Sequence, residues 1–170
     1  MPVLSTTHWA MPLSATGSIV GSAWISGGIG ALSISTIPAI LASGAPTDGL
    51  VRAWHTQFTR ALYIPTIGVI TGLNYFYLAY RHRAVGREWR GYATGGVANL
   101  LLVPFTLLFI AGINNTLIAS LGNAQGSSNR NIMSLDTARQ LVKRWGDLNF
   151  YRIFMPLAGA ALGLWNLLGA

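Results

Sequence analysis

Four long apolar stretches constrain this chain more than any other feature of its sequence. They occupy roughly residues 16–42, 58–80, 92–113 and 148–168, and each is long enough for the ~20 residues that a helix needs to cross a bilayer. Only 9% of the residues are charged, whereas soluble domains carry about a quarter. The sequence therefore predicts an all-α membrane protein, a bundle of four transmembrane helices, with residues 1–170 in a single membrane-embedded domain.

The charged residues predict how the helices are oriented. There are 11 Lys and Arg against 4 Asp and Glu, and the cations flank the apolar stretches, which favours anchoring in a lipid bilayer over binding to nucleic acid. Residues 81–90 contain four arginines, and the positive-inside rule predicts that this turn is cytoplasmic. Both termini are then cytoplasmic, and the loops after the first and third spans face the lumen or the exterior. We expect the endoplasmic reticulum or another endomembrane.

Small residues predict where the helices pack closely. Ser14, Ser18, Ser22, Ser26 and Gly30 recur every fourth position in the first span. Such a stripe lets a second transmembrane helix approach closely, and Gly159 and Gly163 offer a similar surface in the fourth span. We expect Asn74 and Asn99 to form a structural interhelical hydrogen bond, and Pro38 to kink or end the first span.

Three segments lie outside the predicted spans. Residues 43–56 are expected to form a polar loop, and residues 122–131 a flexible one. Ser134 has the character of a helix N-cap. The pattern from Leu135 onward is amphipathic, which predicts a short lumenal helix at the membrane surface that leads into the fourth span.

Polar and aromatic residues concentrate at the predicted lumenal edge of the bundle. They are Trp54, His55, Arg60, Asn114, Asn115, Trp145, Asn149 and Arg152. The last three fall at i, i+4 and i+7 and so share one helical face. Polar groups at the rim of a span are costly and by default indicate function. Each also has a structural reading as a solvated histidine, a headgroup-binding arginine, an interfacial tryptophan or a helix-capping asparagine.

The sequence offers few ligands for a cofactor. It has no cysteine, three histidines and four acids. Only His55 of the three histidines lies at the predicted site, whereas a membrane haem needs two that face each other. A di-iron bundle needs several inward carboxylates, and no Glu-x-x-His spacing or phosphate-binding loop is present. We therefore predict no cofactor and no metal.

Two motifs give the chain a resemblance to a known family. The stretch from Pro104 to Leu117 ends in Ile-Asn-Asn-Thr-Leu, and the stretch from Leu141 to Arg152 reads Leu-Val-Lys-Arg-Trp-Gly-Asp-Leu-Asn-Phe-Tyr-Arg. The chain resembles the anthrone oxygenases, which are small four-helix membrane proteins. The resemblance rests on the Asn pair followed by Trp-x3-Asn-x2-Arg, together with Trp54-His55 at the entry to the second span. The resemblance implies oxidation of an anthrone to a quinone by molecular oxygen, in an aromatic polyketide pathway and without an evident cofactor.

That chemistry assigns a role to each candidate residue. His55 is the expected base and Arg152 the expected counter-charge of the substrate anion, and both are designated catalytic. The expected substrate contacts are Arg60 as a second cation, Asn114, Asn115 and Asn149 as hydrogen-bond donors, and Trp54 and Trp145 as a sandwich for a flat ring. The expected partner is a hydrophobic aromatic molecule that partitions into the bilayer.

Two other functions remain open at this point. The chain is alternatively a non-enzymatic four-helix scaffold, which predicts a dispersed and solvated polar rim. It is alternatively a carrier of quinones or similar aromatic molecules, which predicts binding without turnover.

Overall fold

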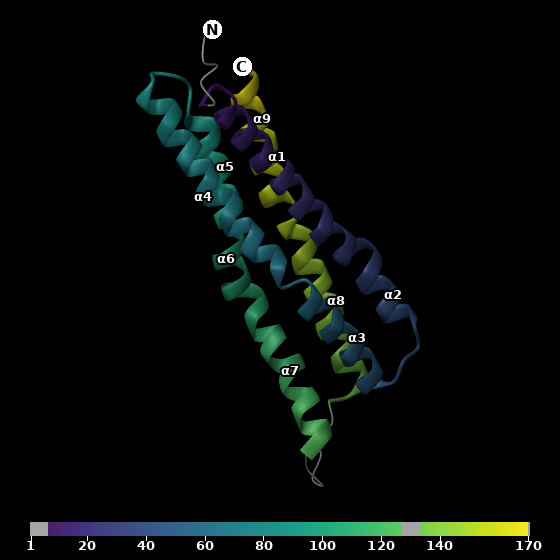
Figure 1. Cartoon of the computed structure of the whole chain (residues 1–170). Helices are drawn as coiled ribbons and strands as arrows, with labels where there is room; N and C mark the ends of the chain where they lie inside the picture. The colour runs from purple at the N-terminus through teal and green to yellow at the C-terminus, as the bar shows by residue number, and fades with distance from the viewer. Residues whose placement is uncertain (1–6, 127–132, 170) are drawn as a thin grey trace. The chain divides into compact units, whose positions relative to one another are not determined.

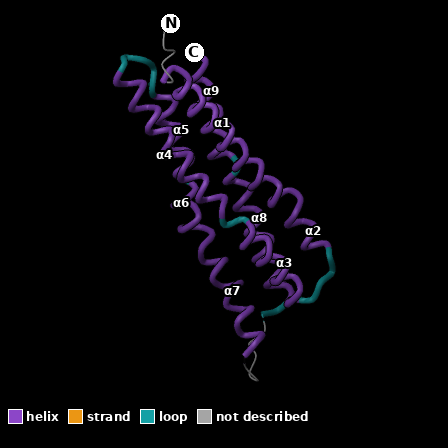
Figure 2. The backbone as a smooth tube through the Cα atoms, in the orientation of Figure 1, coloured by secondary structure: helices purple, strands orange, loops and turns teal. Residues whose placement is uncertain are grey.

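The computed structural model describes the backbone of residues 7–126 and 133–169, and the side chains of residues 10–121 and 133–169. Every regular element in these ranges is helical (Figures 1 and 2). The elements are α1 (Thr7–Ala31), a π-helical turn (Leu32–Thr36), α2 (Ile37–Ala42), α3 (Thr47–Arg60), α4 (Tyr63–Ala84), α5 (Arg90–Leu100), α6 (Leu102–Phe105), a second π-helical turn (Thr106–Ile110), α7 (Ala111–Gly126), α8 (Leu135–Arg152) and α9 (Phe154–Leu168). The all-helical prediction is confirmed.

Three helical segments within the described ranges are long and apolar enough to cross a membrane. They are Ala10–Ala42, Thr47–Ala84 and Arg90–Leu121, and they contain the first three predicted spans. Helix α9 has 15 residues, fewer than the ~20 that span a bilayer without help from neighbouring segments. The fourth span therefore stays a prediction.

Prolines account for the interruptions in the long helices. The helical pattern is interrupted at Leu62, Leu101 and Ile153, and a proline follows each interruption by three residues. Proline has no backbone N–H to donate, and its ring clashes with the carbonyl of residue i−4. Pro38 is accommodated differently, because the π-helical turn Leu32–Thr36 immediately precedes α2 and the helix continues to Ala42. Pro38 therefore does not end the first span.

The prediction of a loop over residues 43–56 is wrong from Thr47 onward, because α3 begins there. Leu50, Val51 and Trp54 are buried on one face of α3, while Asp48 in the first turn pairs with Arg52 on the outer face at 2.8 Å. The polar residues that indicated a loop belong to the outer face of an amphipathic helix. His55 consequently lies on a helix.

The third predicted span also extends further than expected. Helix α7 continues through Asn114 and Asn115 to Gly126, so the asparagine pair does not end the helix. Residues 122–126 are therefore helical, and the rest of the loop predicted for residues 122–131 lies outside the described residues.

The described chain divides into two compact units. Residues 7–27, 65–102 and 154–169 belong to the first unit, and residues 28–64 and 103–153, without the segment 127–132, belong to the second. The prediction of one domain over residues 1–170 stays a prediction.

The serine stripe of α1 is an interior surface of the first unit. Ser18, Ser22 and Ser26 are buried. Asn74 donates from Nδ2 to Oγ of Ser18 at 2.7 Å, and Ser22 donates from Oγ to Oδ1 of Asn99 at 3.2 Å. Close packing of this face is confirmed, and both asparagines bond across helices. The serines of α1, rather than the other asparagine, are their partners.

Helices α5 and α9 lie side by side in the same unit (Figure 1). A Cβ atom added at Gly159 would overlap the side chain of Asn99, and one added at Gly163 would overlap the ring of Tyr75. The second close-packing surface is therefore confirmed as well.

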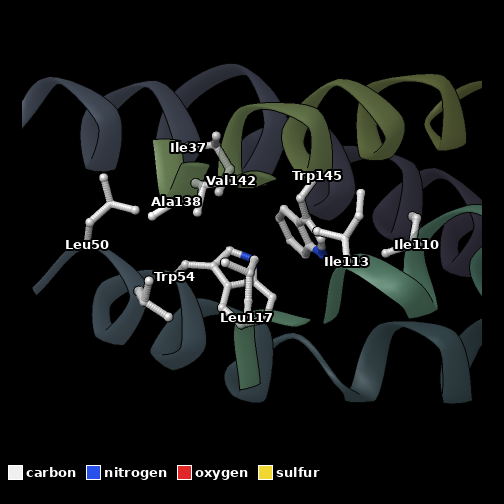
Figure 3. Close-up of a cluster of buried hydrophobic side chains, with 10 residues drawn as sticks. Ile37, Leu50, Trp54, Ile110, Ile113, Leu117, Ala138, Val142 and Trp145 are labelled. Atoms are coloured by element: carbon white, nitrogen blue, oxygen red, sulfur yellow. The ribbon is translucent and has the colours of Figure 1, made fainter. Parts of the chain in front are cut away.

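The core of the second unit is formed by α2, α3, α7 and α8 with the second π-helical turn (Figure 3). The Oγ of Ser134 accepts a hydrogen bond from the backbone N–H of Thr137 at 3.1 Å, which confirms the predicted N-cap of α8. One face of α8 packs into this core through Ala138, Val142 and Trp145. The placement of α8 at a lumenal membrane surface stays a prediction.

Candidate functional site

Helix α8 carries three candidate residues on its buried face. Trp145, Asn149 and Arg152 are 3%, 2% and 7% exposed, which agrees with their expected i, i+4, i+7 spacing on one face. The outer face of α8 is charged and includes the exposed ion pair of Lys143 with Asp147. The amphipathic pattern thus places the candidate residues inside the unit.

Hydrogen bonds join these side chains in a row and extend to α7. Arg152 donates from Nη1 to Oδ1 of Asn149 at 2.7 Å, and Asn149 donates from Nδ2 to the backbone carbonyl of Trp145 at 2.8 Å. Trp145 donates from Nε1 to Oδ1 of Asn114 at 2.9 Å. The row ties the orientation of the Arg152 guanidinium to the packing between α7 and α8.

Arg152 is a buried cation without a carboxylate partner. The ion pairs in the described part of the chain join Arg52 to Asp48 and Lys143 to Asp147, and all four side chains are exposed. The Nε of Arg152 is buried and has no hydrogen-bond acceptor among the described residues. A buried charge is costly unless it is paired, so this position is suited to an anion supplied by a ligand.

Aromatic rings form the wall beside this row. Trp54 is completely buried, and its ring meets that of Trp145 edge to face, with 6.1 Å between centroids and 88° between planes (Figure 3). Phe58 stacks on Trp54 at 5.3 Å. The two indoles therefore contact each other and leave no gap for a flat ring, unlike the expected sandwich. Their role as substrate contacts stays a prediction.

His55 lies at the rim of the same aromatic group. It is half-buried, and its ring centroid is 6.3 Å from that of Trp54 and 6.4 Å from that of Phe58. As the next residue along α3, it is turned by about 100° from the buried direction of Trp54. It is therefore partly accessible while it remains next to the buried rings.

Two predicted residues do not join this group. Asn115 is exposed on α7, since it is turned by about 100° from Asn114. Arg60 is exposed in the last turn of α3. The structure thus gathers Trp54, Asn114, Trp145, Asn149 and Arg152, with His55 at the rim, and the catalytic or binding role of every candidate stays a prediction.

Arg60 instead lines an open groove that the sequence did not reveal. The groove has a volume of about 290 Å³ and is lined by Gly28, Ala31, Leu32, Thr36, Gln57, Arg60, Ala61, Tyr63 and Ile64. Gln57 and Arg60 have i, i+3 spacing on α3, which ends at Arg60. A helical interpretation of residues 47–60 would have placed them on one face.

The described residues contain no group of three or more His, Cys, Asp or Glu side chains placed to hold a metal ion. The prediction that the protein uses neither a metal nor another cofactor rests on its sequence and stays a prediction.

Comparison with known proteins identifies the family of this fold. The sequence profile of a family described as anthrone oxygenase matches residues 54–162, a range that includes every candidate residue. No solved structure matches the chain.

Three relatives cover most of the chain. A monooxygenase of Dothistroma septosporum is 33% identical over 86% of this chain and 78% of its own length. An anthrone oxygenase of Paecilomyces divaricatus is 32% identical over 96% of this chain and 100% of its own. A noranthrone monooxygenase of Aspergillus flavus is 28% identical over 89% of this chain and 72% of its own.

Proposed function

Since this chain belongs to the anthrone oxygenase family, we propose that it is an oxidoreductase that converts an anthrone-type aromatic polyketide to the corresponding quinone with molecular oxygen. The observation that carries this proposal beyond family membership is the buried Arg152, which has an amide rather than a carboxylate as its partner. An anthrone that loses a proton becomes a delocalised phenolate anion. A buried cation that lacks an internal counter-ion is suited to stabilise it.

The proposed reaction balances without an added reductant. The methylene carbon between the two aromatic rings of an anthrone loses two hydrogens and gains one oxygen atom, which is a four-electron oxidation. One atom of O₂ becomes the new carbonyl oxygen and the other leaves as water with the two hydrogens. The protein therefore has to remove a C–H proton, hold the resulting anion and admit oxygen.

The candidate residues supply these functions in the following way. His55, partly accessible beside Trp54, takes the proton as a general base, the role that histidine most often fills near neutral pH. Arg152 stabilises the negative charge that develops on the phenolic oxygen. Asn149 orients the guanidinium through its 2.7 Å hydrogen bond, and Asn114 fixes the indole of Trp145.

The membrane supplies the substrate in this proposal. A polycyclic aromatic molecule partitions into the bilayer, and three helical segments of this chain are apolar and long enough to lie there. We propose that residues 148–168 form a fourth span and that both termini are cytoplasmic in an endomembrane. Protease protection of terminal tags in sealed microsomes tests the orientation, and tags protected inside the vesicles would overturn it.

Oxygen consumption by the purified protein tests the proposed activity. In nanodiscs supplied with an anthrone and ¹⁸O₂, we expect one O₂ consumed per quinone formed, with one labelled atom in the quinone and the other in water. The rate is expected to be the same after treatment with a chelator. Saturable binding of the anthrone without oxygen uptake would instead identify a carrier.

A further inference from the structure

The groove between α3 and the first π-helical turn is a second feature of the second unit that needs an explanation. Its wall on one side is formed by Gly28 and Ala31 of α1 with Leu32 and Thr36 of the π-helical turn. The opposite wall is formed by the end of α3 and the start of α4. Single π-helical turns within α-helices are frequent at functional sites.

The lining combines an apolar slot with a few polar groups. Leu32 and Ile64 contribute branched aliphatic side chains, and Tyr63 contributes an aromatic ring. The hydroxyl of Thr36 already bonds to the backbone carbonyl of Ala31 at 3.3 Å. The polar side chains on the α3 wall of the groove are those of Gln57 and Arg60.

The charge at this groove is not neutralised from within the protein. The chain has four acids. Asp48 and Asp147 pair with Arg52 and Lys143, and the carboxylate of Glu88 accepts hydrogen bonds from the backbone of residues 89 and 90. Asp136 lies in the first turn of α8, and no ion pair joins it to Arg60 in the described structure. Within the described residues, Arg60 therefore has no carboxylate partner, and its exposed guanidinium is accessible to an anionic ligand.

We propose that this groove binds an edge of the flat aromatic substrate and that Arg60 pairs with an anionic oxygen on that edge. This inference rests on the proposed function and adds a specificity-determining subsite to it. The contact between Trp54 and Trp145 leaves no room for a ring between them, so the ring system needs another place on the protein. A groove of about 290 Å³ is at the small end of ligand pockets, which run from ~300 Å³ upward. It therefore suits a ring edge with its substituent rather than a whole polyketide.

Binding of two probes to the full-length protein in phosphatidylcholine nanodiscs tests the subsite. Anthraquinone-2-carboxylate carries an anionic edge, and anthraquinone lacks one. We expect Arg60→Gln to weaken binding of the carboxylate roughly ten- to a hundredfold, the range for loss of a hydrogen bond to a charged group. Binding of neutral anthraquinone should change less than threefold.

The matched control is Arg144→Gln, which removes another exposed arginine, on the outer face of α8. It should leave both affinities unchanged, which separates Arg60 from a general effect of charge on membrane partitioning. In a further variant, Ala31→Trp fills the groove and should weaken both probes. Equal effects of the two arginine substitutions, or wild-type binding in Ala31→Trp, would overturn the subsite.

Two further experiments complete the test. The first asks whether a lipid headgroup rather than the substrate binds in the groove, and the second asks whether the groove contributes to the enzymatic activity. If the carboxylate probe binds more weakly in nanodiscs rich in phosphatidylglycerol, and Arg60→Gln abolishes this loss while Arg144→Gln does not, a lipid headgroup occupies the groove and the proposal is overturned. In oxygen uptake with an acidic anthrone, Arg60→Gln should raise KM and keep kcat. Wild-type KM in an active Arg60→Gln enzyme defeats the subsite alone, whereas probe binding without any oxygen uptake by the wild-type protein defeats the proposed activity alone.

Discussion

Arg152 donates a hydrogen bond to the side-chain oxygen of Asn149 across 2.7 Å, and both side chains are buried. A neutral amide orients the guanidinium but cannot cancel its charge. A carboxylate at the same position would cancel it and compete with any anionic ligand. The pairing therefore keeps a cation available inside the second unit, at the end of the row that includes Trp145.

Substitution of Arg152 tests whether this charge serves catalysis. Arg152→Ala should lower kcat by roughly 10²–10³, the range for removal of one group that stabilises a developing oxyanion, and should also weaken substrate binding. Arg152→Lys should restore activity only in part, because lysine lacks the planar fork of donors. Oxygen uptake with an anthrone provides the measurement.

Two variants distinguish charge from packing in that experiment. Arg152→Met keeps much of the side-chain volume without the charge and should be as inactive as Arg152→Ala. Arg144→Ala, on the exposed face of the same helix, should behave as the wild type. Full activity in Arg152→Met would mean that the residue only fills space.

His55 provides the second test of the mechanism. Its removal in His55→Ala should reduce turnover by roughly 10²–10⁴, the usual contribution of a general base. The melting temperature should stay close to that of the wild type, since the side chain is only half-buried. Quinone formation followed by absorbance is a suitable assay.

The adjacent Thr56→Ala is a control for His55→Ala, because Thr56 is exposed on α3 and its hydroxyl donates to the backbone carbonyl of Arg52. Wild-type rates in His55→Ala would remove the base from the scheme. Activity that is lost with a chelator and restored by one metal would instead make His55 a metal ligand.

Periodicity predicted the parts of the site that lie on one helix. The i, i+4, i+7 spacing of Trp145, Asn149 and Arg152 was sufficient to place them on one face, and their burial follows from the apolar residues on that face. The partner of Trp145 was not predictable in this way. Asn114 precedes it by 31 residues, and only the packing of α7 against α8 brings the two together.

The groove was missed for a different physical reason. Asp48, Arg52 and other polar residues on the outer face of α3 resembled a loop, so the shared face of Gln57 and Arg60 went unnoticed. The opposite wall depends on a π-helical turn, which shifts side-chain directions relative to a regular helix. That change in side-chain direction cannot be predicted from composition or hydropathy.

Glu88 predicts a dependence of stability on pH. The backbone N–H of Arg90, and secondarily that of Trp89, donate to its Oε1 at 3.0 and 3.1 Å and hold the pKa of the carboxyl below its usual range. A lowered folded-state pKa stabilises the protein above the ordinary value of 4.5, and this stabilisation disappears as pH falls through the folded-state pKa. The wild type should therefore lose thermal stability in detergent as the pH is lowered below 4.5. Glu88→Gln should lose less, because a neutral amide can accept the same hydrogen bonds at every pH.

Asn114 forms part of an Asn-Asn-Thr sequence, the formal acceptor pattern for N-glycosylation. We expect it to remain unmodified, because it lies in the first turn of helix α7, directly after the second π-helical turn, and its side chain accepts the indole hydrogen bond of Trp145. An endoglycosidase should leave the mass of the protein unchanged, and Asn114→Gln should migrate like the wild type. A glycosidase-sensitive mass that disappears in Asn114→Gln would contradict this.

Ser22 and Ala23 form a matched pair for the packing of the first unit. Ser22 is 0% exposed and bonds to Asn99, whereas Ala23 is exposed on the next position of α1. Ser22→Leu should cost roughly 1–3 kcal/mol through overpacking and about 1 kcal/mol more through the lost hydrogen bond. Ala23→Leu adds the same side chain where no packed neighbour opposes it and should leave the thermal midpoint in detergent unchanged.

Ser22→Ala separates the cost of overpacking from the cost of the lost hydrogen bond, since it removes the hydroxyl without adding volume. If the two leucine variants melt alike, the serine face is turned toward lipid and the close contact of α1 with α5 through Asn99 is not what holds this unit together.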